Sequence, residues 1–338
     1  MENALYDSDI HFETLLKKYD CKLLILTHPT HSFELPLYKS ALKLSIPTIG
    51  VLRSWDNIHK GLRIRPDHLT VWNNVNKQEA VDLLKLAPDQ VYITGGSQFD
   101  GYFSENITQS TRVGFCDKYN LDPNRPIIMV ATLGAFIYLY DEQYIIDFLI
   151  DSIINGTILR DSQLIIRLHP TSRLEYVLKY LEYDFIKLSY IKEYIPSIGW
   201  TMTRSEVEEV GYILKHSDVV VSPGSTITIE TAIFDTPTIV PIFRLYQPDA
   251  GIEVFQYHFA THFRRLRDEN LVPVVADKEN LIKEINKSLN DQNHYSLQRK
   301  QLAKDYIHYF DRESTQRIAE FIFEKMPNYM MKLSICQS

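Results

Sequence analysis

The chain has 338 residues, 45% of them hydrophobic and 23% charged, and a formal net charge of −7. Such a chain can bury a full core and is long enough for two globular domains. Its acidic balance argues against a general nucleic-acid binder. Its longest uncharged apolar run, residues 126–140, is shorter than the roughly 20 residues of a membrane-spanning helix.

The cysteines and the first twenty residues indicate the cellular compartment of the protein. Cys21, Cys116 and Cys336 lie far apart and lack metal-ligand or redox spacing, which is typical of reduced thiols in a cytoplasmic protein. Residues 1–20 are acidic and amphipathic, without the basic and then apolar segments of a signal peptide. We therefore expect a cytoplasmic protein, with peripheral association with a membrane assembly complex left open.

Strands and helices alternate through the first 120 residues. Helical spacing of apolar residues predicts a helix up to about residue 20, and others near residues 32–44 and 77–86. Continuous apolar runs predict buried strands at residues 22–27, 47–52, 69–72 and 90–94. Because polar residues follow each strand, the pattern indicates a parallel sheet with a ligand crevice at the carboxyl ends of its strands. We predict a first, acceptor-side Rossmann-like domain over residues 1–120.

A second α/β domain is predicted over residues 121–310. A helix near residues 109–119 leads into residues 120–126, where two prolines and turn residues interrupt the pattern, as expected for an interdomain linker. Apolar runs then predict strands at residues 127–132, 164–168, 185–188, 219–221 and 238–240. Helical spacing predicts helices near residues 144–154, 206–215, 278–289, 296–309 and 313–325. Residues 311–338 are expected to form a C-terminal helix that packs back, followed by a tail.

Residues 217–232 hold the strongest functional signal. The β-branched run 219–221 ends in Ser222-Pro223-Gly224-Ser225-Thr226, and Glu230 follows one turn into the next helix. Small residues let a backbone approach a ligand closely, and N–H groups and hydroxyls at a helix start bind phosphate oxygens. Glu230 could accept a hydrogen bond from a ribose hydroxyl. A plain helix cap uses the same residue types, so a purely structural role for Ser225 or Thr226 stays open.

A second signal lies at the end of the strand at residues 164–168, where His169 precedes Pro170. A histidine there can hydrogen-bond a phosphate or a base, and it would share a sheet edge with residues 222–226. The alternative is a loop histidine that caps a carbonyl. Arg167, inside the strand, is expected on the other face of the sheet.

These motifs carry a resemblance to a known class of enzymes. A Leu-His-Pro strand end, followed later by Ser-Asp-Val-Val-Val-Ser-Pro-Gly-Ser-Thr and a helix with a glutamate, resembles the nucleotide-binding half of GT-B glycosyltransferases. The most similar groups are bacterial surface-polysaccharide enzymes: CDP-glycerol glycerophosphotransferase-like proteins, and sialyl- and Kdo-transferases with a His-Pro motif and a serine motif. The resemblance covers about residues 120–310, and the first domain only by its architecture and its Ser-Trp-Asp-Asn segment. It implies two Rossmann-like α/β domains facing a central cleft, here with a short first domain that opens on a helix.

The resemblance also implies roles for residues of the second domain. In such families the His-Pro histidine and the serine or threonine residues contact the donor nucleotide and its phosphate. The implied donor site consists of His169, Ser222, Gly224, Ser225 and Thr226, with Glu230 directed at a ribose. Because backbone and hydroxyl groups hold phosphate in this fold, no metal and no other cofactor is expected.

An inverting transfer needs a general base near the acceptor hydroxyl, which we expect at the strand ends of the first domain. Asp56 is the first candidate, with His59, His28 and His31 as rivals. A turn role for Asp56 stays open, because turns favour Asp-Asn pairs. Trp55 could stack on a sugar or serve as a core anchor.

Tyr257 and His258 follow the last predicted strand of the second sheet and are candidate cleft contacts, or members of an amphipathic helix with buried aromatics. Together these features predict a metal-independent glycosyltransferase. It would move a sugar or polyol-phosphate group from a nucleotide-sugar or a CMP- or CDP-activated donor to a glycan or lipid-linked acceptor, in the synthesis of capsule or another surface polysaccharide. The alternatives are a UDP-N-acetylglucosamine 2-epimerase-like enzyme and a non-catalytic nucleotide-binding subunit.

Overall fold

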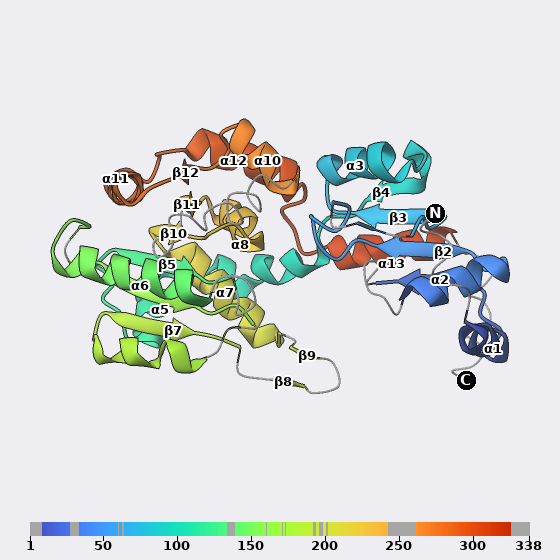
Figure 1. Ribbon diagram of the computed structural model, residues 1–338, viewed down its shortest axis with the longest axis horizontal. Helices are drawn as coiled ribbons and strands as arrows, with labels where there is room; N and C mark the ends of the chain where they lie inside the picture. Colours follow the sequence, from blue (N-terminus) through green and yellow to red (C-terminus); the bar gives the residue numbers. More distant parts are fainter. Residues whose placement is uncertain are drawn as a thin grey trace. The chain divides into compact units, whose positions relative to one another are not determined.

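The computed structural model describes residues 9–27, 34–59, 61–62, 64–133, 139–159, 161–170, 172, 174–191, 194–195, 199–200, 202–242 and 261–325. The chain forms two compact units: Gly101–Lys304, and a discontinuous unit of Met1–Asp100 with Asp305–Ser338. Each unit contains a parallel sheet with helices around it, so the predicted α/β class with two sheets is confirmed (Figure 1). Among the helices of the described residues, none is long and apolar enough to cross a membrane.

The first unit is built on a four-stranded parallel sheet with the order β1-β2-β3-β4. Its strands are β1 (Leu24–Leu26), β2 (Thr48–Val51), β3 (His68–Val71) and β4 (Val91–Ile93). Its helices are α1 (Ile10–Lys18), α2 (Glu34–Lys43), α3 (Asn74–Leu84), the short 3-10 helix η2 (Pro88–Gln90) and α13 (Ser314–Lys325).

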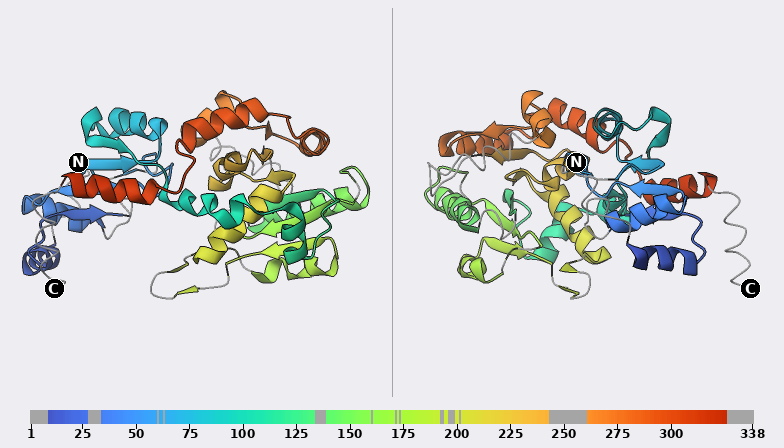
Figure 2. Two further views of the ribbon diagram at one scale, coloured as in Figure 1. Left: turned by 180° about the vertical axis from the view of Figure 1, so that it is seen from behind. Right: turned by 45° about the vertical axis from the view of Figure 1, so that its right-hand side comes forward.

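Helix α13, drawn in red, lies beside the blue strands of the first unit although it is distant in the sequence (Figures 1 and 2). Phe321 packs this helix on the sheet, with its ring centroid 4.1 Å from that of Tyr92 and 5.8 Å from that of His68. The first unit is therefore completed by a segment that follows the whole second unit in the chain.

The second unit is built on a six-stranded parallel sheet with the order β12-β11-β10-β5-β6-β7. Its strands are β5 (Ile127–Ala131), β6 (Gln163–Arg167), β7 (Ile186–Ser189), β10 (Val219–Val221), β11 (Thr238–Pro241) and β12 (Val274–Val275), and β8 (Tyr194–Ile195) and β9 (Gly199–Trp200) form a separate antiparallel pair. Its helices are α4 (Glu105–Thr108), α5 (Arg112–Tyr119), α6 (Leu139–Ile154), η4 (Leu174–Tyr176), η5 (Leu178–Glu182), α7 (Arg204–His216), α8 (Thr226–Glu230), η6 (Thr231–Phe234), α10 (Thr261–Asp268) and α11 (Lys278–Asn290). Two helices, η3 (Ser97–Phe103) and α12 (Ser296–Tyr306), span the boundaries between the units.

The strand order of this sheet contains a topological switch between β5 and β10. From β5 the chain builds outward through β6 and β7, and from β10 it builds in the other direction through β11 and β12. In doubly wound sheets of this kind, ligands bind beyond the carboxyl ends of the strands at the switch. The central strands are buried on both faces, since Ile128, Met129 and Val220 are each 0% exposed. This is why they appear in the sequence as continuous apolar runs.

Side-chain caps fix where the helices begin. Asn73 precedes α3 and its side chain accepts a hydrogen bond from the Asn76 N–H at 2.8 Å. Thr203 and Glu206 form a reciprocal capping box at the start of α7, with the Thr203 N–H 2.8 Å from Glu206 Oε2. Such caps satisfy N–H groups that have no partner within the helix.

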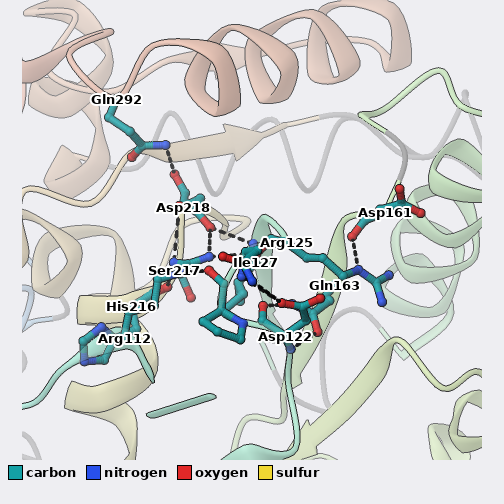
Figure 3. A network of polar contacts seen from close by, with 12 residues as sticks. Arg112, Asp122, Arg125, Ile127, Asp161, Gln163, His216, Ser217, Asp218 and Gln292 are labelled. Atoms are coloured by element: carbon teal, nitrogen blue, oxygen red, sulfur yellow. Dashed lines mark hydrogen bonds and ion pairs between the residues drawn. The ribbon is translucent and has the colours of Figure 1, made fainter. Parts of the chain in front are cut away.

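A polar network holds the amino end of the second sheet together (Figure 3). The Asp218 carboxylate, just before β10, accepts from Arg112 Nη2 at 2.8 Å and from the Ile127 N–H at 2.7 Å. The Arg112 guanidinium also donates to the carbonyls of Pro123, Arg125 and His216, each at 2.8 Å. One arginine thus links the starts of β5 and β10, at the edge of the sheet opposite the carboxyl ends of these strands.

Candidate active site

Three polar segments follow neighbouring strands of the second sheet. Ser222 comes directly after β10, Thr132 comes directly after β5, and His169 is the second residue after β6. These three strands are adjacent and parallel. Their carboxyl ends therefore lie at one edge of the sheet, beside the switch between β5 and β10. The structure brings the two predicted donor motifs to the same edge, with Thr132 between them.

The turn after β10 is rich in hydroxyl groups. Gly224 has φ of +96°, a conformation that glycine adopts without strain, and it turns the chain from the strand into α8. Ser225 is the N-cap of α8, and its Oγ accepts from the Ile227 N–H at 3.3 Å. Ser222 is fully buried, with its Oγ 3.3 Å from Ser225 Oγ, whereas Ser225 and Thr226 are half-buried. Ser222 therefore stabilises the turn from the protein interior, whereas the hydroxyls of Ser225 and Thr226 are the ones that a ligand could reach.

His169 is fixed by its backbone. Its N–H donates to Thr132 Oγ1 at 2.8 Å, and its carbonyl accepts from the Ser172 N–H at 2.8 Å. Burial, and then the charge of Arg167, lower the pKa of the His169 imidazole to about 4. The side chain is consequently neutral near pH 7, so it can offer one ring nitrogen as a donor and the other as an acceptor.

Glu230 lies in the interior behind this turn. It is 8% exposed, and burial raises the pKa of its carboxyl to about 7. The charge of Arg167 lowers the pKa of both Glu230 and His169, while Arg167 Nη1 itself donates to Ser189 Oγ at 2.9 Å. Side chains two residues apart along an extended chain share a face, so the spacing of Arg167 and His169 does not favour the predicted placement on opposite faces. The assignment of Glu230 to a ribose stays a prediction.

The base candidates follow β2 in the first unit. The Ser54 N–H donates to Asn57 Oδ1 at 2.8 Å, which closes a turn that contains the buried Trp55 and Asp56. The Trp55 ring packs edge-on against Tyr306, with centroids 5.5 Å apart, in accordance with the core-anchor interpretation. The roles of Asp56 as a base and of Trp55 in sugar stacking stay predictions.

His59 belongs to a pair that the sequence did not reveal. Its Nε2 lies 2.8 Å from Oε1 of Glu79 on α3, and this hydrogen bond raises the pKa of His59. Asn76 Nδ2 donates to Glu79 Oε2 at 3.0 Å and to the Trp55 carbonyl at 2.9 Å. A carboxylate that orients an imidazole in this way is common among general bases.

Some predicted residues are outside the described part of the chain, namely His28, His31, Tyr257 and His258. Among the described residues, no group of three or more His, Cys, Asp or Glu side chains is arranged to hold a metal ion. The residues that sequence reasoning missed are Thr132 and Glu79. Thr132 meets His169 across 37 residues of the chain and Glu79 meets His59 across 20, so no local motif signalled either contact.

Two α/β units that each contain a parallel sheet define the GT-B class. The second unit here is doubly wound and has a hydroxyl-rich turn at its switch point. Solved structures with the same fold include the wall teichoic acid polymerase TagF, with 12% identity and a TM-score of 0.56 over 94% of each chain. Staphylococcus aureus MnaA, solved with UDP, has 16% identity and a TM-score of 0.57 over 94% of this chain and 79% of that one. The UDP-GlcNAc 2-epimerase of Neisseria meningitidis, bound to UDP-GlcNAc, has 14% identity and a TM-score of 0.57 over 93% and 79%. At these identities the likeness establishes the fold.

The family is established by sequence. Residues 57–324 match the model of the CDP-glycerol:poly(glycerophosphate) glycerophosphotransferase family, and the chain belongs to this family. It is a glycosyltransferase-type enzyme of GT-B fold. No curated protein matches the chain significantly.

Proposed function

We propose that the protein transfers a glycerol-phosphate-like polyol phosphate from a CDP-activated donor to a surface glycan acceptor, without a metal ion. The observation that carries this proposal is the carboxyl edge of the second sheet, where His169, Thr132 and residues 222–226 follow three adjacent strands. Family membership supports the polyol-phosphate group and the cytidine nucleotide. TagF, a structural neighbour, was solved after a soak with CDPG.

In this proposal the second unit holds the donor. The half-buried hydroxyls of Ser225 and Thr226, with the N–H groups at the start of α8, bind the phosphates, and Gly224 lets the backbone approach them. The neutral imidazole of His169 donates a hydrogen bond to a phosphate oxygen without adding a fixed charge. Hydroxyl and N–H donors of this kind stabilise the negative charge that develops on the leaving group.

The chemical step is a displacement at phosphorus. The acceptor hydroxyl oxygen attacks the phosphorus that carries the polyol, and the bond from this phosphorus to the bridging oxygen breaks. CMP leaves with the electron pair of that bond, and the hydroxyl proton goes to a general base of the first unit. Asp56 is the proposed base, with the Glu79-oriented His59 as its rival. Chemistry of this kind on a nucleotide-activated donor is consistent with a cytoplasmic enzyme that works on a membrane-associated acceptor.

The proposal is tested by incubating the protein with CDP-glycerol, with and without a poly(glycerol phosphate) acceptor, in the presence of EDTA. We expect CMP release that requires the acceptor, together with lengthening of the acceptor by mass spectrometry. Loss of activity in EDTA would remove the metal-independent mechanism. Conversion of UDP-GlcNAc without an acceptor would instead identify an epimerase, and failure of CMP, CDP and UDP to bind in calorimetry would exclude both enzymes.

Single variants test the roles of the residues. His169→Ala is expected to weaken CDP binding, whereas the control His294→Ala, whose Nε2 pairs with Glu284 at 2.7 Å on α11, is expected to leave it unchanged. Removing the general base lowers turnover by about 10²- to 10⁴-fold. Comparison of Asp56→Asn with His59→Asn therefore identifies which of the two acts as the base.

A further inference from the structure

A buried asparagine of the first unit lies beside the turn that carries the base candidates. Asn76, on α3, is 0% exposed. Its Nδ2 donates to the Trp55 carbonyl at 2.9 Å and to Glu79 Oε2 at 3.0 Å. An amide nitrogen has two hydrogens, so both are used, and the two acceptors fix the direction in which the amide faces. The Asn76 side chain therefore links the turn after β2 to α3.

The Asn76 amide is costly to bury. Within the described part of the chain, its Oδ1 atom is buried and accepts no hydrogen bond. A buried acceptor without a partner destabilises a folded protein and calls for an explanation. An apolar side chain of similar size would avoid this cost, but it could not hold the Trp55 carbonyl and the Glu79 carboxylate in fixed positions. The fixed position of these two acceptors is therefore what the amide provides.

Asn76 and Glu79 together hold both ends of one turn, and we call these two side chains the α3 clamp. They are three residues apart and lie on the same side of the helix. Asn76 holds the Trp55 carbonyl, and Glu79 Oε1 lies 2.8 Å from His59 Nε2. Asp56 lies between Trp55 and His59 in the sequence. Both base candidates therefore belong to the segment that the α3 clamp holds.

The start of α3 is fixed by a second buried asparagine. The Oδ1 atom of Asn73, which is 0% exposed, accepts from the Asn76 N–H at 2.8 Å. Its Nδ2 donates to the Tyr306 carbonyl at 2.8 Å. The Tyr306 ring in turn packs edge-on against Trp55, with centroids 5.5 Å apart. Contacts that do not involve Glu79 thus position both α3 and the turn.

We propose that Asn76 is a positioning residue of the base site, whose amide holds the Glu79 carboxylate against His59 and holds the turn that carries Asp56. This inference rests on the proposed function, because it requires a general base in the first unit. A base must meet the acceptor hydroxyl at hydrogen-bond distance, and a misplacement of about 1 Å can lower the rate about a hundredfold. Asn76 itself touches no reacting atom and acts through the residues that it holds.

The protonation of His59 makes the effect of the clamp measurable. The Glu79 hydrogen bond raises the pKa of His59, and burial opposes this rise. The charges that act on His59 are those of Glu79 on α3 and of Asp56 on its own turn. Without the Asn76 hydrogen bond the Glu79 carboxylate can turn away from the imidazole, so the pKa of His59 should fall. If Asn76 only supports the fold, this pKa should stay where it is.

The experiment compares Asn76→Leu with the wild type in CMP release from CDP-glycerol in the presence of a poly(glycerol phosphate) acceptor. Leucine is similar in size to asparagine and favours a helix more, but it donates no hydrogen bond. We expect kcat to fall about a hundredfold. The KM for CDP-glycerol should be unchanged, because its proposed site is in the second unit. NMR titration between pH 5 and pH 9 should show a lower pKa for His59, whose signal is assigned by its loss in His59→Asn.

Glu79→Ala opens the clamp at its other end and keeps the inference testable if Asn76→Leu does not fold. The Glu79 side chain is 20% exposed, so its removal leaves no closed cavity. This variant should also lower kcat and the pKa of His59. The double variant should lose no more activity than Asn76→Leu alone, because residues that act as a unit are not additive.

The matched control is Asn286→Leu in the second unit. Asn286 is half-buried on α11, its Nδ2 donates to the Thr157 carbonyl at 2.7 Å, and its Oδ1 accepts from the Leu159 N–H at 3.1 Å. This variant also removes an amide that ties a helix to a loop, and it should keep the wild-type kcat and the wild-type pKa of His59.

Two results would overturn the inference: a wild-type kcat in folded Asn76→Leu or in Glu79→Ala, or a lower kcat with an unchanged pKa of His59. A wild type that releases no CMP in the presence of the acceptor would instead overturn the proposed function. The NMR titration would then still show whether Asn76 holds Glu79 against His59.

Discussion

Replacing Ser225 separates the two roles that its position allows, a helix cap and a phosphate ligand. Its Oγ accepts from the Ile227 N–H at 3.3 Å, and its own N–H lies 3.4 Å from Thr228 Oγ1. Ser225→Ala removes the cap, which is expected to lower the free energy of unfolding by about 1 kcal/mol. If the hydroxyl also binds phosphate, the variant loses a hydrogen bond to a charged group worth about 1.5–3 kcal/mol, or roughly 10- to 150-fold in Kd for CDP.

Ser225→Asp distinguishes the two roles more sharply. Aspartate is as good an N-cap as serine, and its charge is favourable at a helix N-terminus, so the variant should be about as stable as the wild type. Its carboxylate would nevertheless face the donor phosphate. Two like charges about 4 Å apart near a protein surface repel by about 4 kcal/mol, which corresponds to a loss of roughly a thousandfold in affinity.

Urea unfolding and calorimetry with CDP measure these two effects separately. Asp277→Ala is the matched control, because Asp277 caps α11 by accepting from the Asn280 N–H at 2.7 Å and lies outside the donor turn. It should lose stability and keep its CDP affinity. If Ser225→Asp is stable and binds CDP as tightly as the wild type, Ser225 is only a cap and the phosphate assignment is wrong.

Three further predictions concern stability. Arg112→Ala removes one donor from the Asp218 carboxylate, which keeps the Ile127 N–H, and the donor of three carbonyls, so it should lower the free energy of unfolding in urea by about 1–3 kcal/mol, while Arg112→Lys should lose less. The pKa of His169 is about 4 in the folded protein, so the unfolded chain binds the proton first as the pH falls below 6.5. The free energy of unfolding should therefore decline between pH 6.5 and pH 4. In His169→Asn, this free energy, measured against pH, should decline less steeply. Gly95→Ala combines a φ of +85° with a Cβ 2.5 Å from Ser314 Oγ, whereas Gly61→Ala has a similar φ of +87° and open space, so Gly95→Ala should show the larger drop in Tm. Equal drops for the two glycine variants would show that the Ser314 contact relaxes without cost.

The sequence predicted those parts of the fold and of the candidate site that local sequence patterns determine. The β-branched run before Ser222 and the Pro-Gly pair after it specify a buried strand and a turn, and these are the β10–α8 connection of the structure. His169 was found in the same way, from a strand that ends in His-Pro. The sequence pattern also located the strands on both sides of the switch, because strands buried on two faces are continuously apolar.

The remaining parts of the site depend on contacts between remote segments. Thr132 after β5 accepts from the His169 N–H after β6, and Glu79 on α3 pairs with His59 after β2. Neither Thr132 nor Glu79 stands in a recognisable sequence pattern, because tertiary packing sets the hydrogen bonds of each. The predicted placement of Arg167 and His169 on opposite faces stays a prediction, although a spacing of two residues in an extended chain favours one face.

The discontinuity of the first unit has a consequence for how the protein is made. Residues 101–304 are contiguous, so the second unit can complete its sheet as soon as they have been synthesised. The first unit must wait for residues 305–325, which supply Tyr306 against Trp55 and Phe321 against Tyr92. Until then the turn that carries Asp56 lacks part of its support. A ribosome-bound intermediate would thus possess the proposed nucleotide site before it possesses the proposed base, and donor binding would then precede the ability to use the donor.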